Sequence, residues 1–390
     1  MIKINFSSSK RVVVKLGSSI VTKEGGGINE LQLAHIVEQI AELVRQKKEV
    51  VLVSSGAIAA GLKKLGYKER PHQLSELRAA ASVGQMVIAQ IYEQLFSKAG
   101  LVSSLVLLTH DDLSIKKSYL NARSTISHLI ENKIIPVINE NDTVADDEIR
   151  FGDNDTLAAM VANLIEADYL VLLTDQEGLF SDDPRKNTKA ILIDHAYIDD
   201  AKLEVVAQDT TSKVGTGGML TKIKAAQRAS LSGTHTIIAS GKTPNILIQL
   251  NEDESAGTHL ECNVPELVTK KKWIANNLRS KGKIYIDKGA EEAIVFNGKS
   301  LLPAGVIRAE GKFNRGEIVR CINSKNKEIA KGLVNYSSQE LEKIKGYSSN
   351  EIELLLGYIN ESNLIHRDNM VIFFKEKIKK EKIKKEKVNE

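Results

Sequence analysis

The sequence predicts an α/β protein in which helices sandwich a mostly parallel sheet, followed by a small β-rich domain. Two observations lead to this prediction. Across the first 270 residues, apolar runs rich in β-branched residues alternate with longer stretches of helical period, the pattern of strands joined by crossover helices. After Trp273 the chain becomes polar and then gives short β-like runs interrupted by glycine. A chain of 390 residues has room for both domains.

The elements of the first domain can be assigned in order along the chain. Strands are predicted where β-branched runs occur, at residues 12–16, 50–54, 104–108, 134–139, 169–173 and 235–239. Helices are predicted around residues 31–46, 74–99, 121–132, 157–165 and 220–231, several of them opened by Asn, Asp or Thr. Ligands of such sheets gather at the carboxyl ends of the strands, so functional residues are expected directly after each strand.

The second domain and the tail complete the chain. Short strands are predicted at residues 283–286, 293–296, 318–322, 329–333 and 370–374. We therefore expect a first domain at residues 8–277 and a second at 281–374, separated by a polar linker. Residues 375–390 repeat Lys and Glu with a period of five, which fits neither a helix nor a strand, and are predicted to be a disordered tail.

Composition and charge narrow the function classes. Hydrophobic residues make up 42% and charged residues 27%, an ordinary globular mix that disfavours extended disorder and fibrous repeats. The formal charge is +4, yet residues 375–390 alone hold eight Lys and four Glu, so the rest of the chain is balanced. The basic pI therefore says little about the folded surface.

Targeting and metal signals are weak. No apolar run approaches the ~20 residues that cross a bilayer, and the first residues lack the apolar stretch of a signal peptide. The cysteines Cys262 and Cys321 lie far apart, and the histidines show no paired spacing. We expect a cytoplasmic protein with no membrane contact and no metal ion held by a cluster of its own residues.

The first predicted strand leads into a glycine turn. Lys15 is followed by Gly17 and two serines, so an ammonium group stands beside free backbone N–H groups. Such a turn can hold phosphate, although a surface lysine at a strand end explains the segment equally well.

The second strand ends in small residues, from Ser54 and Ser55 to Gly61. The segment superficially resembles a P-loop, but Leu62 occupies the position where that loop needs lysine, which excludes it. Close helix packing is the favoured explanation for Gly61.

Acids and amides gather after the fourth strand, in the segments INEND and GDND. One of them, Asp153 or Asp155, is expected to cap the helix that starts near Thr156. The others are favoured as ligand contacts, because amides together with carboxylates suit a substrate that carries both an ammonium and a carboxylate group. That combination describes an amino acid.

Two further segments suit a nucleotide. Thr174 and Asp175 end the fifth strand, although a simple loop explains them equally well. Further on, three glycines precede a helix that carries Lys222. A helix N-terminus with about half a positive charge, supplemented by a lysine, favours an anion over a plain turn.

Taken in order, these segments resemble the amino acid kinase family, through VVVKLGSS, VLVSSGAIAAG, PVINENDTVADDEIRFGDNDTLAA, LLTDQEGLFSDDPR and VGTGGMLTKIKAA. Downstream, the segment IDKGAEEAIVFNGKSLLPAGVIRAEGKFNRGEIVRC resembles the PUA domain, an RNA-binding module of RNA-modifying enzymes. The resemblance implies the amino acid kinase fold, followed by a small PUA domain.

The resemblance also implies an activity. It points to ATP-dependent phosphorylation of the γ-carboxylate of L-glutamate to L-glutamyl 5-phosphate, the first step of proline biosynthesis. It further implies Mg²⁺ as a cofactor with ATP, proline as a feedback inhibitor, and a homo-oligomer. Lys15 and Lys222 are the implied catalytic residues, and Ser55, Asp142 and Asn154 match glutamate-binding positions. The implied ATP contacts are Lys15, Thr174, Asp175, Thr216, Gly217, Gly218, Met219, Leu220, Thr221 and Lys222.

A mechanism follows from this assignment. The side-chain carboxyl of glutamate has a pKa of about 4.3, so the nucleophile is already ionised at neutral pH and needs no general base. Lysines then stabilise the transferring phosphoryl group, and Asp175 or Asp153 is expected to hold one of them in position.

Two alternatives stay open. One is a sister kinase that acts on another carboxylate or carbamate. The other is an RNA-binding protein that acts through the second domain, but residues 281–374 hold 14 Lys and Arg against 12 Asp and Glu, a weak excess for a phosphate-backbone binder.

Overall fold

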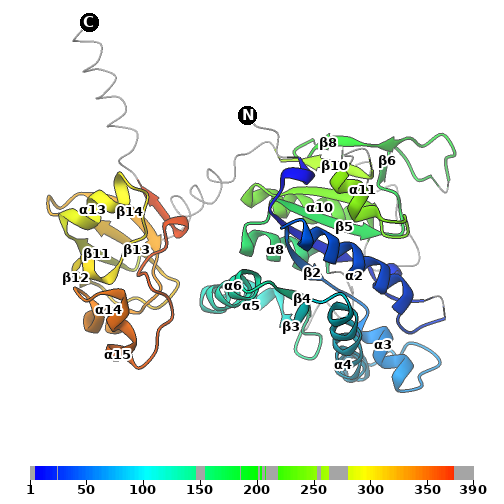
Figure 1. Ribbon diagram of the computed structural model, residues 1–390, viewed down its shortest axis with the longest axis horizontal. Helices are drawn as coiled ribbons and strands as arrows, with labels where there is room; N and C mark the ends of the chain where they lie inside the picture. Colours follow the sequence, from blue (N-terminus) through cyan, green and yellow to red (C-terminus); the bar gives the residue numbers. More distant parts are fainter. Residues whose placement is uncertain are drawn as a thin grey trace, which may run out of the picture. The chain divides into compact units, whose positions relative to one another are not determined.

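The computed structural model describes residues 5–23, 25–145, 154–184, 186–200, 203, 207, 218–252, 256–262 and 280–372. The chain divides into two compact units, Met1–Glu266 and Leu267–Glu390 (Figure 1). The predicted linker begins at residue 275 and the predicted tail at 375, so both lie largely or wholly outside the described residues. The domain limits 8–277 and 281–374 therefore stay predictions.

The first unit is built on an eight-stranded sheet in the order β3-β4-β2-β1-β5-β9-β10-β8. The bounds are β1 Arg11–Leu16, β2 Glu49–Val53, β3 Val102–Leu108, β4 Ile134–Glu140, β5 Tyr169–Thr174, β8 His195–Tyr197, β9 His235–Ser240 and β10 Thr258–Glu261. All pairs from β3 to β9 are parallel, β10 runs antiparallel to β9, and β8 is parallel to β10. The six predicted strands are confirmed to within two residues. The short strands β8 and β10, and the separate pair of β6 (Leu179–Phe180) and β7 (Leu192–Ile193), were not predicted.

Helices cover both faces of this sheet (Figure 1). Their bounds are α1 Ser18–Val21, α2 Glu30–Arg45, α3 Ala57–Lys64, α4 Leu74–Lys98, α5 His110–Ser114, α6 Lys116–Glu131, α8 Asp155–Ile165, α10 Met219–Ala229 and α11 Ile246–Glu252, with single 3₁₀ turns η1 Phe6–Ser8 and η2 Ser230–Ser232. The five predicted helices correspond to α2, α4, α6, α8 and α10, and α6 begins five residues earlier than predicted. The fold class expected from the sequence is confirmed.

Strand β1 shows how the two faces differ. Val12 and Val14 pack in the cluster with α2, α4 and α11, whereas Val13 packs in the cluster with α6, α8 and α10. Successive side chains of a strand point to opposite faces, so Lys15 shares the face of Val13. The alternating side-chain directions along β1 therefore place this lysine on the face that α8 and α10 cover.

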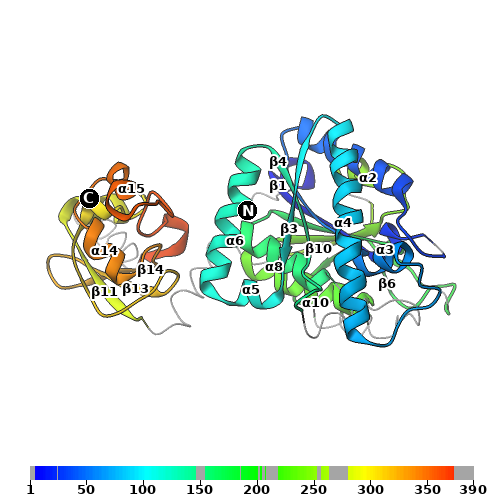
Figure 2. The ribbon, with the colours of Figure 1, turned by 90° about the horizontal axis from the view of Figure 1, so that it is seen from below.

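Two glycines allow α3 and α4 to lie side by side (Figure 2). A Cβ added to Gly61 would lie 1.7 Å from the carbonyl oxygen of Ala80, and one added to Gly84 would lie 1.7 Å from that of Ala57. The backbones thus approach too closely for any side chain at either position. Close helix packing, expected for Gly61, explains this residue.

The second unit contains a five-stranded sheet in the order β12-β11-β13-β14-β15. Its elements are β11 Gly282–Ile286, α13 Lys288–Val295, η3 Pro303–Gly305, β12 Val306–Glu310, β13 Ile318–Ile322, β14 Glu328–Leu333, α14 Ser338–Ile344, η4 Ser349–Glu351, α15 Ile352–Leu356, η5 Arg367–Asn369 and β15 Met370–Ile372. The strand predicted at 293–296 is wrong, because Asp287 accepts a hydrogen bond from the Ala290 N–H and starts helix α13 there. Strand β12 was not predicted. In the part of the chain that the structure describes, no helix has the length and apolarity needed to span a membrane.

Candidate active site

Four adjacent parallel strands bring the predicted site residues to one edge of the first sheet. Lys15 lies near the end of β1, Ser55 follows β2, Asp142 lies in the turn after β4, and Thr174 ends β5. Because β4, β2, β1 and β5 are neighbours, their carboxyl ends meet at the same edge. Residues that are more than 150 positions apart in the sequence thus come together.

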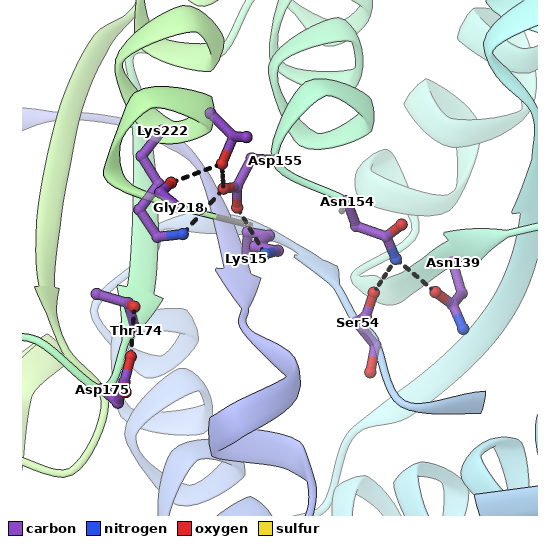
Figure 3. Close-up of polar contacts among 10 residues, drawn as sticks. Lys15, Ser54, Asn139, Asn154, Asp155, Thr174, Asp175, Gly218 and Lys222 are labelled. Carbon is purple, nitrogen blue, oxygen red and sulfur yellow. Dashed lines mark hydrogen bonds and ion pairs between the residues drawn. The ribbon is translucent and has the colours of Figure 1, made fainter. Parts of the chain in front are cut away.

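Asp155 lies between the two predicted catalytic lysines (Figure 3). Its Oδ1 is 2.5 Å from Nζ of Lys15, and its Oδ2 is 3.0 Å from Nζ of Lys222. The three residues come from α8, β1 and α10, and they are 0%, 4% and 5% exposed, respectively. A single carboxylate therefore fixes both ammonium groups, and the cluster keeps a net charge of one positive unit.

The ionisation of Asp155 is set by two opposing effects. Burial by itself raises the pKa of this carboxyl, but the charges of Lys15 and Lys222 and their hydrogen bonds outweigh burial. The pKa of Asp155 is consequently held well below its usual range, and the carboxylate stays ionised at neutral pH.

The N-terminal ends of two helices strengthen the positive character of this edge. Asp155 opens α8, and α10 begins at Met219 directly after Gly218. The hydroxyl of Thr221 lies 2.7 Å from the Gly218 carbonyl and 3.1 Å from Oδ2 of Asp155, so it ties the two helix starts together. Free N–H groups and the helix dipole at such ends favour an anion.

The residues predicted to bind an amino acid, Ser55, Asp142 and Asn154, are called here the amino-acid half of the site. The described contacts of this half centre on the side chain of Asn154 (Figure 3). Its side-chain Nδ2 donates to the Ser54 carbonyl at 2.6 Å and to Oδ1 of Asn139 at 2.7 Å. Ser55 is buried, and its hydroxyl has no hydrogen-bond partner among the described residues. A buried hydroxyl normally has a partner, so a bound ligand at this place would satisfy it.

The residues predicted to bind ATP, namely Lys15, Thr174, Asp175 and 216–222, are called the nucleotide half of the site. The structure describes only some of them. Thr174 is buried, with its hydroxyl 3.1 Å from Oδ1 of the exposed Asp175. Gly218, Met219, Leu220, Thr221 and Lys222 form the start of α10, whereas Thr216 and Gly217 lie outside the described residues. Asp175 therefore contacts its neighbour in the chain.

The residue that contacts both lysines, Asp155, was not assigned to them from the sequence. The sequence suggested Asp175 or Asp153, but Asp175 bonds to Thr174 and Asp153 lies outside the described residues. The structure gives Asp155 this position, with both of its oxygens on lysines. Asp155 does not cap α8 either, because it occupies the first helical position, after Asn154. The signal in the sequence was the second Asp of GDND, Asp155, which is the first residue of α8.

Comparisons with known proteins identify relatives of both units. The model of the amino acid kinase family matches residues 10–240, and that of the PUA domain matches residues 282–356. The chain is 55% identical over 364 residues to glutamate 5-kinase from Nitrosospira multiformis, covering 93% of this chain and 98% of the relative. It is 52% identical over 365 residues to glutamate 5-kinase from Nitrosomonas eutropha, covering 94% and 98%.

The similarity thus runs through both units, and the lysine pair, the acid and amide cluster and the glycine-rich helix start all fall within the matched segment 10–240. The chain belongs to the amino acid kinase family.

Proposed function

We propose that this protein transfers the γ-phosphoryl group of ATP to the γ-carboxylate of L-glutamate, forming ADP and L-glutamyl 5-phosphate, the first step of proline biosynthesis. The observation that carries the proposal is the Lys15–Asp155–Lys222 cluster at the strand-end edge, next to the acid and amide cluster. The relatives named glutamate 5-kinase, which align over nearly the whole chain, support the choice of substrate.

The reaction brings two anions together in line. The substrate carboxylate is ionised at neutral pH, so no side chain has to remove a proton from it. What the protein supplies is preorganised positive charge, from Lys15 on β1 and Lys222 on α10. Asp155 keeps both ammonium groups in place before the substrates arrive, so little reorganisation is needed during phosphoryl transfer.

The nucleotide half holds the phosphates. The N–H groups at the start of α10 and the two lysines are proposed to bind them, with Thr174, Asp175, Thr216 and Gly217 bordering the nucleotide. Phosphoryl transfer from ATP uses a divalent metal ion, and we propose that Mg²⁺ enters with ATP as part of the substrate. Asp155 already pairs with two ammonium groups, and no cluster of three or more His, Cys, Asp or Glu side chains suited to a metal is found among the described residues.

The amino-acid half recognises glutamate. Both N–H groups of the Asn154 amide are used within the protein, which leaves its Oδ1 to accept from the substrate ammonium. Asp142 is proposed to pair with the same ammonium group, and the Ser55 hydroxyl to contact a carboxylate. Feedback inhibition by proline at this half, a homo-oligomeric assembly and a cytoplasmic location are further proposals that follow from the family resemblance.

An acceptor panel tests this function. ADP release is measured with MgATP and L-glutamate, L-aspartate, N-acetylglutamate or no acceptor. We expect turnover with L-glutamate that exceeds every other condition. Equal or higher turnover with another acceptor would assign the protein to a sister kinase.

A further inference from the structure

Helix α4 places two polar side chains against the amino-acid half of the site. Gln85 and Tyr92 are seven residues apart, which corresponds to two turns and puts them on the same face of the helix. Both are buried, at 7% and 1% exposure, on a face whose other residues include Ile88 and Phe96. Polar groups in such an apolar environment need partners.

Each of these side chains hydrogen-bonds to one of the two residues that accept from Asn154: Tyr92 to the side chain of Ser54, and Gln85 to the side chain of Asn139. The Tyr92 hydroxyl lies 2.9 Å from Oγ of Ser54, and the Ser54 carbonyl accepts from Asn154 Nδ2. Gln85 Oε1 accepts from Nδ2 of Asn139 at 3.1 Å, and Asn139 Oδ1 accepts from Asn154 Nδ2. Helix α4 thus contacts both residues to which the Asn154 amide donates, through the Asn139 side chain directly and through Ser54 by way of its hydroxyl.

Gln85 is itself held in a defined orientation. Its Nε2 donates to the backbone carbonyl of Glu140 at 3.0 Å, at the end of β4. With its oxygen on Asn139 and its nitrogen on Glu140, the amide of Gln85 cannot flip without breaking both bonds. The bond to the Glu140 carbonyl also anchors the backbone that leads into the turn containing Asp142.

We propose that Gln85 and Tyr92 are positioning residues that set the affinity of the amino-acid half by orienting Asn154 through Asn139 and Ser54. The inference rests on the proposed function, because it assumes that Asn154 binds the amino-acid substrate. Neither residue touches the lysine cluster in a described contact, so the nucleotide half should be unaffected.

The chain offers matched controls for a merely structural role. Gln39 on α2 is also buried, at 6% exposure, and its amide also donates to one group, the His35 carbonyl, and accepts from another, the Leu247 N–H. Tyr336 in the second unit is buried, and its hydroxyl donates to the Glu361 carbonyl. Each control substitution removes comparable hydrogen bonds, and none of the described bonds of Gln39 or Tyr336 involves Asn154, Asn139 or Ser54.

The experiment measures KM for glutamate, KM for ATP and kcat for Gln85→Met, Tyr92→Phe, Gln39→Met and Tyr336→Phe. Urea unfolding of each variant is measured in parallel. We expect Gln85→Met to raise KM for glutamate about tenfold and Tyr92→Phe about threefold, with KM for ATP changed less than about twofold. Gln39→Met and Tyr336→Phe should change the free energy of unfolding and leave kcat and both KM values unchanged. Tyr92→Phe keeps the ring in place and therefore gives a readout even if Gln85→Met does not fold.

A double-mutant cycle tests the proposed route. Gln85→Met should add nothing to the KM effect of Asn139→Ala, since Asn139 carries the connection to Asn154. Additive effects, or equal changes in both KM values, would overturn the proposal.

Absence of glutamate-dependent ADP release by the wild-type chain would contradict the proposed function and this inference together. Normal wild-type turnover with an unchanged glutamate KM in Gln85→Met and Tyr92→Phe would contradict the inference alone.

Discussion

Asp155 is the residue on which the proposed chemistry depends most, because one buried carboxylate holds two ammonium groups from different elements. Placing two like charges close together is unfavourable unless an opposite charge lies between them. The paired carboxylate makes the arrangement stable while leaving an excess of positive charge for an anionic ligand.

The two lysines are expected to act mainly in the transition state. Replacing Lys222 by Met should lower kcat by about a hundredfold or more while the protein stays folded, as for the loss of one preorganised donor. Lys224→Met, an exposed position on the same helix, is the control and should leave kcat near that of the wild type. A folded Lys222→Met protein with normal kcat would remove Lys222 from the active site.

Asp155→Asn should destabilise the fold in a pH-dependent way. Without the carboxylate, two buried ammonium groups face each other, which costs about 3 kcal/mol at neutral pH. The pKa of Asp155 is lowered in the folded state, so its stabilising contribution is complete above the unfolded pKa and is lost as pH falls toward the folded one. The difference in unfolding free energy between wild type and variant, measured by urea titration, should be constant above about pH 5 and shrink below about pH 4. If this difference grew as the pH fell, an ionisable group other than Asp155 would dominate the pH dependence of stability.

Asp142 is assigned to the ammonium end of the substrate. Asp142→Ala should raise KM for glutamate by at least about tenfold and alter inhibition by proline, while KM for ATP stays within about twofold. Steady-state kinetics with each substrate varied in turn provides the measurement. Equal increases in both KM values would place Asp142 outside the amino-acid half.

At the level of residues, the sequence predicted which strand ends place the candidate site residues along one edge of the sheet, because runs of β-branched residues mark the strands. It could not assign Asp155 to the lysines, because that pairing joins residues 140 and 67 positions apart along the chain. Gln85 and Tyr92 were also missed, since within a long helix their spacing is indistinguishable from that of core positions.

Among the elements, helices α3 and α4 approach each other closely at Gly61 and Gly84. Gly61→Ala should destabilise the protein by about 2 kcal/mol, because the new Cβ would lie 1.7 Å from the Ala80 carbonyl oxygen and force the helices apart. Gly289→Ala in helix α13, where a Cβ would meet nothing closer than 3.4 Å, is the matched control and should be neutral or slightly stabilising. Thermal or urea unfolding measures both. Equal stability of Gly61→Ala and wild type would mean that the helices separate at no cost.

Long elements with a clear pattern of apolar residues could be predicted from the sequence, and short elements could not. Strands β1, β2, β4, β5 and β9 are buried along almost their whole length, and each is centred on a short apolar run, such as Val12–Val14 in β1 and Leu170–Leu173 in β5. Strand β8, with the sequence His-Ala-Tyr, is too short to show any period, and residues 293–295 belong to a helix despite their apolar character, because the cap at Asp287 determines the local structure.

For the whole molecule, the described hydrophobic clusters show which parts can stand alone. The two large clusters of the first unit draw their residues from positions between Phe6 and Leu260, and the main cluster of the second unit draws its residues from positions between Ile284 and Met370. No described cluster combines residues of both units. Removing one unit therefore leaves the described core of the other complete.

A truncated chain of residues 1–277 should accordingly fold and phosphorylate glutamate. Every residue assigned to phosphate or amino acid lies in the unit Met1–Glu266, and the truncation removes none of the contacts that hold Asp155 or Asn154. We expect kcat and both KM values within about threefold of the full-length chain, with any larger change confined to proline inhibition or oligomeric state. Size-exclusion chromatography and an unfolding curve must accompany the assay, because the cut could expose an apolar face and cause aggregation. If the truncated chain is folded and binds ATP but shows no turnover, the second unit supplies part of the active site, and the assignment of catalysis to the first unit alone is wrong.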